Sequence, residues 1–412
     1  MKKMVKQFIA AALLVLGATI GVAAGENIPR PEYPRPQFER TDWVNLNGKW
    51  SFELDLNHVG LEKGYAESKG FQGTILVPFS PESELSGVGH TDFVTGIWYH
   101  RTIDVPASWE GKRVLLNFGA VYYQSDVFVD GKFVGRHFGG SSSFSYDITD
   151  FAAPSTTHDL VVYAQSDLRG MRQPAGKQSL ILGSHDCEYT RTTGIWQTVW
   201  MEPVSENGLK SVQVNTDIDQ RQLVVRPLFY REGASGLRIT LTDPTSPKKP
   251  VAQKTVSAAN SSVAVLPLKT VKTWSPEDPF LYDLSYQVID KDGNVLDDIK
   301  SYVGMRKVHI EGNRVYLNNV PYYQRLVLDQ GYYPQSQWTA PSDEALRHDI
   351  ELSKSAGFNG ARLHQKVFEE RFHYWADKLG YLTWAEFPSW GIELNGVEPA
   401  RNFLSEWAEC VV

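Results

Sequence analysis

The 412-residue sequence has little cysteine, no basic cluster and only one long apolar run, and each shortage excludes a class of protein. Its two cysteines, Cys187 and Cys410, are assigned to different domains, so a disulfide framework is excluded. No Cys/His spacing indicates a metal site, and nothing in the sequence requires a cofactor. The formal net charge of −7 and the lack of a basic patch make nucleic acid a poor partner.

The one long apolar run lies near the N-terminus, from Phe8 to Ala24, and follows three lysines. A charged start, an apolar stretch and small residues at 22–24 are typical of a secretory signal peptide. We predict that residues 1–24 are removed and that the protein is exported to the periplasm or the extracellular space. No membrane segment would remain after cleavage. An uncleaved anchor is the alternative, which the shortness of the run disfavours.

The first large module is predicted to be all-β. Short alternating strands between Trp43 and Pro203 are separated by turn dipeptides such as Asn47-Gly48 and Asp130-Gly131, and no useful helical periodicity appears. This pattern favours a jelly-roll β-sandwich over residues 25–204, in which residues 30–37 form a proline-rich extended lead-in. The 12% aromatic content fits strand packing, and it also suits stacking against sugars.

A second β module is predicted over residues 205–305. Several short strands recur within about 100 residues, which is typical of an immunoglobulin-like sandwich. One of these strands is Tyr282–Val288, and the Asp292-Gly293 turn follows it.

After Gly304 the pattern changes to alternating strands and helices, over residues 306–412. Ser342 is a helix N-cap, and Gly357 and Gly380 are helix ends. The predicted elements are a strand at 322–329, a helix after Ser342, a strand at 360–363, a helix ending at Gly380, a strand at 381–385 and a helix at 402–412. Repeated units of this kind predict parallel strands, as in the first three βα units of a TIM (β/α)8 barrel. The predicted fold class is therefore multidomain, β plus α/β.

Polar side chains follow the predicted parallel strands, where such folds place their reactive groups. The candidate substrate-binding residues are Asp329, Arg362, His364, Glu386 and Trp390. Arg362, His364, Asp329 and Trp390 each have a structural alternative. In these alternatives Arg362 only neutralises Glu386 in a salt bridge, His364 is a hydrogen-bonded structural histidine, Asp329 is a loop or capping carboxylate, and Trp390 contributes to packing. Glu386 is interpreted as a residue that contacts substrate or acts through its charge, rather than one that transfers a proton.

Five motifs in one order resemble the N-terminal part of glycoside hydrolase family 2, the group of β-galactosidases, β-glucuronidases and β-mannosidases. The resemblance covers the whole sequence after the predicted signal peptide. The motifs are LNGKWSFELD, GIWYHRTIDVP with VFVDGKFVGRHFGGSSSFSYDIT, TTGIWQTVWMEPV, DPFLYDLSYQV with YVGMR, and ARLHQKVFEERFHYWADKLGYLTWAEFPSWG.

The resemblance implies hydrolysis of β-linked oligosaccharides or glycosides, as in β-galactosidases, by a retaining double displacement. Such a mechanism uses two carboxyl groups roughly 5–5.5 Å apart. In the family both catalytic glutamates follow later barrel strands, so we expect them beyond Val412 and no catalytic residue within the chain. The chain alone is then expected to be inactive. Arg362, His364 and Glu386 match supporting positions, and family members are commonly dimers or tetramers, so a homo-oligomer is compatible with the resemblance.

Two other interpretations remain open from the sequence. The chain could be an exported, non-catalytic carbohydrate-binding protein, or a fragment of a truncated gene. Binding to glycans without turnover favours the first, and a continuing reading frame after Val412 favours the second.

Overall fold

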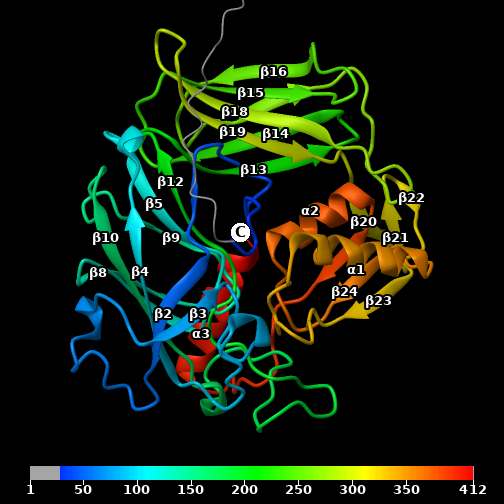
Figure 1. The fold of residues 1–412 in the computed structure, drawn as a ribbon. Coiled ribbons are helices and arrows are strands. Elements are labelled where there is room, and N and C mark those ends of the chain that lie inside the picture. Colours follow the sequence, from blue (N-terminus) through cyan, green and yellow to red (C-terminus); the bar gives the residue numbers. More distant parts are fainter. Residues whose placement is uncertain (1–27, 412) are drawn as a thin grey trace, which may run out of the picture.

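The structure is a computed structural model that describes residues 28–411, and its first part is a β-sandwich of two antiparallel sheets (Figure 1). We call this part the first sandwich. One sheet contains, in spatial order, β1 (Val44–Asn45), β12 (Val199–Val204), β5 (Arg113–Phe118) and β9 (Phe144–Asp147). The other contains β3 (Gly73–Val77), β2 (Gly48–Leu54), β4 (Gly96–Asp104), β10 (Thr157–Gln165), β7 (Gln124–Val129) and β8 (Lys132–Phe138), and a short pair joins β6 (Val121–Tyr122) to β11 (Gly194–Ile195).

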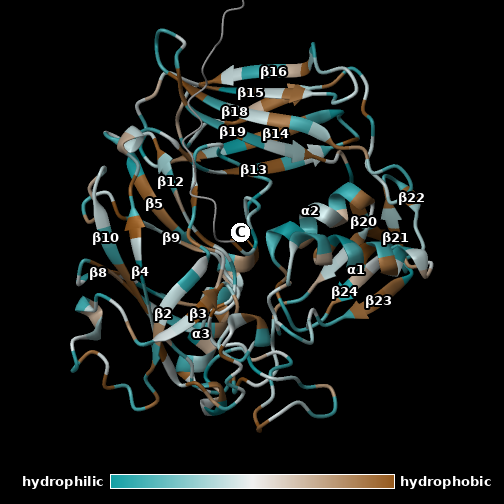
Figure 2. Ribbon diagram, in the orientation of Figure 1, coloured by the Kyte–Doolittle hydropathy of each residue, from teal (hydrophilic) through white to brown (hydrophobic). Residues whose placement is uncertain are grey.

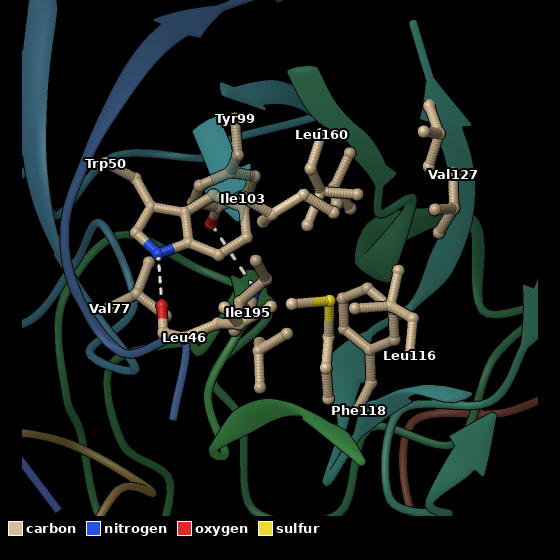
Figure 3. Close-up of a cluster of buried hydrophobic side chains, with 14 of the residues drawn as sticks. Leu46, Trp50, Val77, Tyr99, Ile103, Leu116, Phe118, Val127, Leu160 and Ile195 are labelled. Carbon is tan, nitrogen blue, oxygen red and sulfur yellow. Dashed lines mark hydrogen bonds between the residues drawn. The ribbon is translucent and has the colours of Figure 1, made fainter. Parts of the chain in front are cut away.

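The core of the first sandwich is aromatic and aliphatic, and its buried Trp50 and Tyr99 side chains are hydrogen-bonded (Figure 3). The Trp50 indole donates a hydrogen bond to the Leu46 carbonyl at 2.8 Å. The Tyr99 hydroxyl accepts one from the Ile195 amide at 3.3 Å. Each large apolar side chain buried in this way contributes about 1.5–3 kcal/mol.

The second sandwich shows period-2 burial along its strands. In β18, Tyr282, Leu284, Tyr286 and Val288 are buried and the residues between them are not. Its sheets are β13 (Leu209–Asp217), β14 (Gln222–Phe229) and β17 (Ala264–Pro267), against β16 (Pro250–Val256), β15 (Gly236–Thr242), β18 (Tyr282–Ile289) and β19 (Val295–Val303).

The remaining part, which we call the βα unit, combines a small hairpin sheet with a parallel sheet. The hairpin sheet holds β20 (Val308–Glu311), β21 (Arg314–Leu317) and β22 (Val320–Pro321). The parallel sheet and its helices follow as β23 (Leu326–Asp329), α1 (Asp343–Ser355), β24 (Gly360–Leu363), α2 (Glu370–Leu379), β25 (Leu382–Ala385) and α3 (Val397–Val411).

Two predicted helix ends in the βα unit are confirmed. The Ser342 hydroxyl accepts a hydrogen bond from the Ala345 amide at 3.1 Å, so Ser342 is the N-cap of α1. Gly380 ends α2 in the left-handed conformation, with φ of 70°.

Three predicted boundaries in the βα unit differ from the structure, one of them by a single residue, since the strand predicted at 381–385 begins at Leu382. The strand predicted at 322–329 begins only at Leu326, because the Tyr322 amide donates to the Val315 carbonyl in the preceding hairpin. The helix predicted at 402–412 begins at Val397. Pro399 lies in its first turn, where a missing amide hydrogen costs nothing.

Within residues 28–411, helices cover only one face of the parallel sheet. Ala361 and Leu363 are buried in a core shared with α1 and α2. Their neighbours Leu328, Arg362 and Trp384 lie opposite one another in register, on the other face, and all three are exposed. Figure 2 shows β23 coloured as hydrophobic, in contrast to the largely hydrophilic outer surfaces of α1 and α2.

Helix α3 does not lie on this sheet. It packs against the first sandwich, where the Ser141 amide donates to the Glu406 carboxylate at 2.8 Å and the Asn402 amide group donates to the Arg172 carbonyl at 3.0 Å (Figure 1). The third helix therefore joins the βα unit to the first sandwich.

The lead-in before β1 connects all three parts through buried arginines. Arg30 pairs with Glu369 in the βα unit at 2.6 Å. Arg40 pairs with Glu202 in the first sandwich at 3.1 Å and with Asp297 in the second at 2.9 Å.

The predicted signal peptide, residues 1–24, lies outside the described residues. Within residues 28–411, no helix is both long and apolar enough to cross a membrane. The same part of the chain contains no group of three or more His, Cys, Asp or Glu side chains arranged to hold a metal ion.

Candidate functional site

Two side chains and one backbone amide converge on the Glu386 carboxylate at the carboxyl end of the parallel sheet. Arg362, on the open face of β24, donates to one oxygen of Glu386 through its Nε. The other oxygen accepts from the Gln365 backbone amide at 3.3 Å and lies 4.0 Å from Nε2 of His364. The structure thus contains the Arg362–Glu386 ion pair. The Arg362 side chain is 46% exposed, so the pair remains open to a ligand.

His364 is largely buried and incompletely paired. Its Nδ1 has no hydrogen-bond partner within the described residues. Burial lowers the pKa of His364 below its ordinary value, Lys177 and Arg362 lower it further, and Glu386 opposes the shift. The lowered pKa favours the neutral ring, which has one donor and one acceptor nitrogen. A buried nitrogen without a partner argues against a purely structural role.

Trp390 forms a wall beside His364. The two rings meet edge to face, with centroids 5.9 Å apart. The Lys177 ammonium lies 3.5 Å from the centroid of the indole ring and also donates to the Cys187 sulfur at 3.2 Å. Trp390 is 41% exposed, so the site has an accessible aromatic surface next to a cation.

Gln365 fixes the position of the segment that carries Trp390. Its side-chain oxygen accepts from the amides of Ser389 and Trp390, at 2.9 and 3.0 Å. Its nitrogen donates to the Ser389 hydroxyl at 3.1 Å. Gln365 itself has a φ of 58°, which bends the chain directly after β24.

A loop of the first sandwich completes the wall. The amides of Ala175 and Gly176 both donate to the Trp390 carbonyl, at 3.0 and 3.2 Å. Gly176 has a φ of 62°, and a Cβ there would lie 2.3 Å from the Gln365 carbonyl oxygen. Only glycine fits this approach.

Asp329 lies apart from the other four predicted residues. In register it is opposite Leu363, so its side chain faces the helices, whereas Arg362 faces the open side. Its carboxylate accepts from the Gly331 amide at 2.8 Å. Burial raises the pKa of Asp329, although that hydrogen bond and the Lys366 charge oppose the shift. The structure therefore brings together Arg362, His364, Glu386 and Trp390, without Asp329.

Sequence reasoning missed Lys177 and did not single out Gln365 as a positioning residue. Lys177 belongs to a loop of the first sandwich, so a search for residues that follow the parallel strands did not find it. The Pro174-Ala175-Gly176 turn before it was the available signal, because glycine in a loop often marks a close backbone approach.

Comparisons with known proteins point to one family. Residues 43–199 match the model described as glycosyl hydrolases family 2, sugar binding domain, and residues 197–306 match the model described as glycosyl hydrolases family 2.

Similar proteins are named as glycosidases. A β-glucuronidase of Paenibacillus borealis is 24% identical, over 84% of this chain and 59% of that protein. A β-galactosidase of Thermoanaerobacter pseudethanolicus is 26% identical, over 75% of this chain and 41% of that protein. The chain thus spans about half the length of these relatives.

A solved structure has the same fold. The β-glucuronidase from Ruminococcus gnavus in complex with D-glucuronic acid superposes with a TM-score of 0.78 at 21% identity. The match covers 93% of this chain and 66% of that one.

Proposed function

Because this chain belongs to glycosyl hydrolases family 2, we propose that it serves in the hydrolysis of β-glycosides by a retaining mechanism. The names of its relatives, β-glucuronidase and β-galactosidase, support a β-linked glycoside as substrate. We also propose that β23–β25 belong to a (β/α)8 barrel, whose substrate end is the carboxyl end of its strands. Export, with removal of residues 1–24, is part of the proposal and is tested by sequencing the N-terminus of the secreted protein.

The observation that carries the proposal is the convergence of Arg362, His364 and the Gln365 amide on Glu386 at that end of the sheet. These groups offer donors and acceptors to sugar hydroxyls, and the Trp390 ring offers a flat apolar surface. Pockets with a few convergent polar groups beside an aromatic wall are the usual form of a small-ligand site.

The proposal divides binding from bond cleavage. Both Glu386 oxygens already receive hydrogen bonds, so this carboxylate is suited to orient the sugar and to act through its charge. Proton transfer and nucleophilic attack are assigned to the two glutamates that the family resemblance puts after Val412. Hydrolysis of an aryl β-galactoside by the 412-residue chain itself would contradict this assignment.

A β-galactoside is the expected sugar, and a β-glucuronide is the second candidate. The Paenibacillus borealis relative and the Ruminococcus gnavus structure favour the second. The two cations near the wall, Arg362 and Lys177, also suit a sugar carboxylate.

Titration calorimetry with lactose and with methyl β-glucuronide tests the binding residues. We expect Arg362→Ala and His364→Ala each to weaken binding of the preferred sugar about tenfold or more, because each removes a hydrogen-bonding group from the site. The control is Arg347→Ala, which removes an exposed arginine that pairs with Glu344 at 2.5 Å on α1. Unchanged affinity in both site variants would refute the assignment, and the tighter of the two sugars identifies the substrate class.

A further inference from the structure

A separate cavity lies between the first sandwich and α3. Its volume is about 350 Å³, within the roughly 300–1,000 Å³ of small-ligand sites. None of the residues that converge on Glu386 lines it. Its lining includes Tyr123, Gln124, Phe138, Gln165, Arg172 and Glu398.

The floor of this cavity is a row of three side chains across neighbouring strands. Gln165 on β10 lies opposite Gln124 on β7, and Gln124 lies opposite Phe138 on β8. Residues directly opposite one another project from the same face of a sheet. The row therefore places two amides beside one aromatic ring, and that ring is 39% exposed.

The hydrogen-bonding groups of the floor are free. Within residues 28–411, the side-chain amides of Gln124 and Gln165 make no hydrogen bond. Each amide offers two donor hydrogens and one acceptor oxygen. Tyr123 lines the same cavity, is only 4% exposed, and its hydroxyl has no partner in that part of the chain. The buried Tyr123 hydroxyl without a partner is costly, and two partly exposed amides lie beside it at the same cavity, so this group points to a ligand.

Among the described residues, the cavity has no uncompensated cation, because two carboxylates, Asp167 and Glu398, line it together with one arginine, Arg172. Arg172 lies 3.7 Å from Glu398, which belongs to the first turn of α3. A phosphate or carboxylate ligand would need an uncompensated cation. Free amides beside an aromatic face instead suit a neutral polyhydroxylated molecule.

We propose that this cavity binds a neutral sugar unit and is a non-catalytic site distinct from the residues around Glu386. The site goes beyond the proposed hydrolysis, because its residues would retain a glycan at the first sandwich without taking part in bond cleavage. Its occupant would lie on Phe138 and accept and donate hydrogen bonds through Gln124 and Gln165.

The test uses the His364→Ala protein, so that binding around Glu386 is weakened, with lactose as the probe in calorimetry. Lactose should still bind saturably to this protein. Adding Phe138→Ala or Gln165→Ala should weaken the binding about tenfold. Adding Phe133→Ala should leave it unchanged, since Phe133 is on the same strand, is 53% exposed and does not line the cavity.

Two results would overturn the proposal. One is the absence of saturable lactose binding in the His364→Ala protein. The other is binding that Phe138→Ala and Gln165→Ala leave unchanged. Failure of the proposed hydrolytic site gives a different result, namely wild-type lactose affinity that His364→Ala and Arg362→Ala do not alter.

Discussion

Gly176 shows how one residue joins the first sandwich to the βα unit. Its φ of 62° is rarely adopted by residues with a side chain, and a Cβ would collide with the Gln365 carbonyl oxygen at 2.3 Å. Gln365 in turn holds the segment that carries Trp390. A methyl group at position 176 should therefore disturb the wall of the candidate site.

We predict that Gly176→Ala lowers the free energy of unfolding by about 2–3 kcal/mol and weakens sugar binding. The matched control is Gly183→Ala, because Gly183 also has positive φ, 80°, but a Cβ there meets nothing within 4 Å. The free energy of unfolding of the Gly183→Ala control should fall by only about 1 kcal/mol, because the substitution adds backbone strain but no collision. Chemical denaturation of both variants checks this, and equal losses would contradict the steric argument.

The candidate site was predictable where the residues follow strand ends. Arg362, His364, Glu386 and Trp390 were selected by that rule, and the structure brings them together. Asp329 satisfied the same rule, but its side chain lies on the opposite face of the sheet from that of Arg362. The face cannot be read from a sequence whose strand boundaries are uncertain. Lys177 depends on contact between modules, which no local pattern encodes.

At the scale of single elements, α3 carries two glutamates that face the first sandwich, and their pKa values are shifted in opposite directions. Burial raises the pKa of Glu406 to about 8; the Glu409 charge adds to this shift, and hydrogen bonds from the Ser141 and Gly140 amides oppose it. The pKa of Glu409 is lowered, because hydrogen bonds from His137 and Ser142 outweigh its burial. Tyr122 and Tyr123 also face Glu406 from the sandwich.

We predict that Glu406→Gln stabilises the protein at pH 8. The folded protein keeps the Glu406 proton up to about pH 8, whereas the unfolded chain loses it near the ordinary pKa of 4.5. The stability of the fold is therefore highest below pH 4.5 and falls as the pH rises toward 8. The amide oxygen of glutamine can still accept from Ser141, so the variant should gain on the order of 2 kcal/mol at pH 8 and lose the pH dependence between 5 and 8.

The control is Glu409→Gln, because the pKa of Glu409 is lowered and the pH dependence of its contribution to stability is the reverse of that of Glu406. The stability contributed by Glu409 is present above pH 4.5 and is lost as pH falls, so this variant should be slightly less stable than the wild type at pH 7 and equal to it at low pH. Thermal unfolding measured from about pH 3 to 8 checks both variants. Parallel pH profiles for wild type and Glu406→Gln would contradict the assignment.

The elements of the βα unit were predictable because their caps are local. Ser342 and Gly380 fixed two helix ends from the sequence alone. The start of β23 was not predictable in this way, because Tyr322 pairs with Val315 in a hairpin that competes with the strand. The packing of α3 on the first sandwich depends on distant partners, and its own sequence does not specify them.

At the scale of the whole molecule, Arg40 is the buried cation shared by the two sandwiches. It pairs with Glu202 and Asp297 and donates to the Leu209 carbonyl at 2.6 Å. Removing it would leave two buried carboxylates without their cation, which is far costlier than breaking an exposed pair.

We predict that Arg40→Met lowers the free energy of unfolding by about 3–5 kcal/mol and separates the unfolding of the two sandwiches into distinct transitions. Arg231→Met is the control, because Arg231 pairs with Glu206 on the surface and both side chains are more than half exposed. It should cost less than about 1 kcal/mol. Denaturant unfolding followed by tryptophan fluorescence distinguishes the two, and a similar small loss in both variants would refute the role of Arg40.

The lead-in also has a consequence for the order of events during synthesis. Arg30 is translated early, but its partner Glu369 follows 339 residues later. At roughly 5–20 residues per second, a ribosome needs on the order of 17–70 seconds to make that partner. Both sandwiches can fold during this delay, while Arg30 of the lead-in still lacks its partner Glu369 in the βα unit. Attachment of the lead-in to the βα unit through Arg30 and Glu369 would then be a late step in folding.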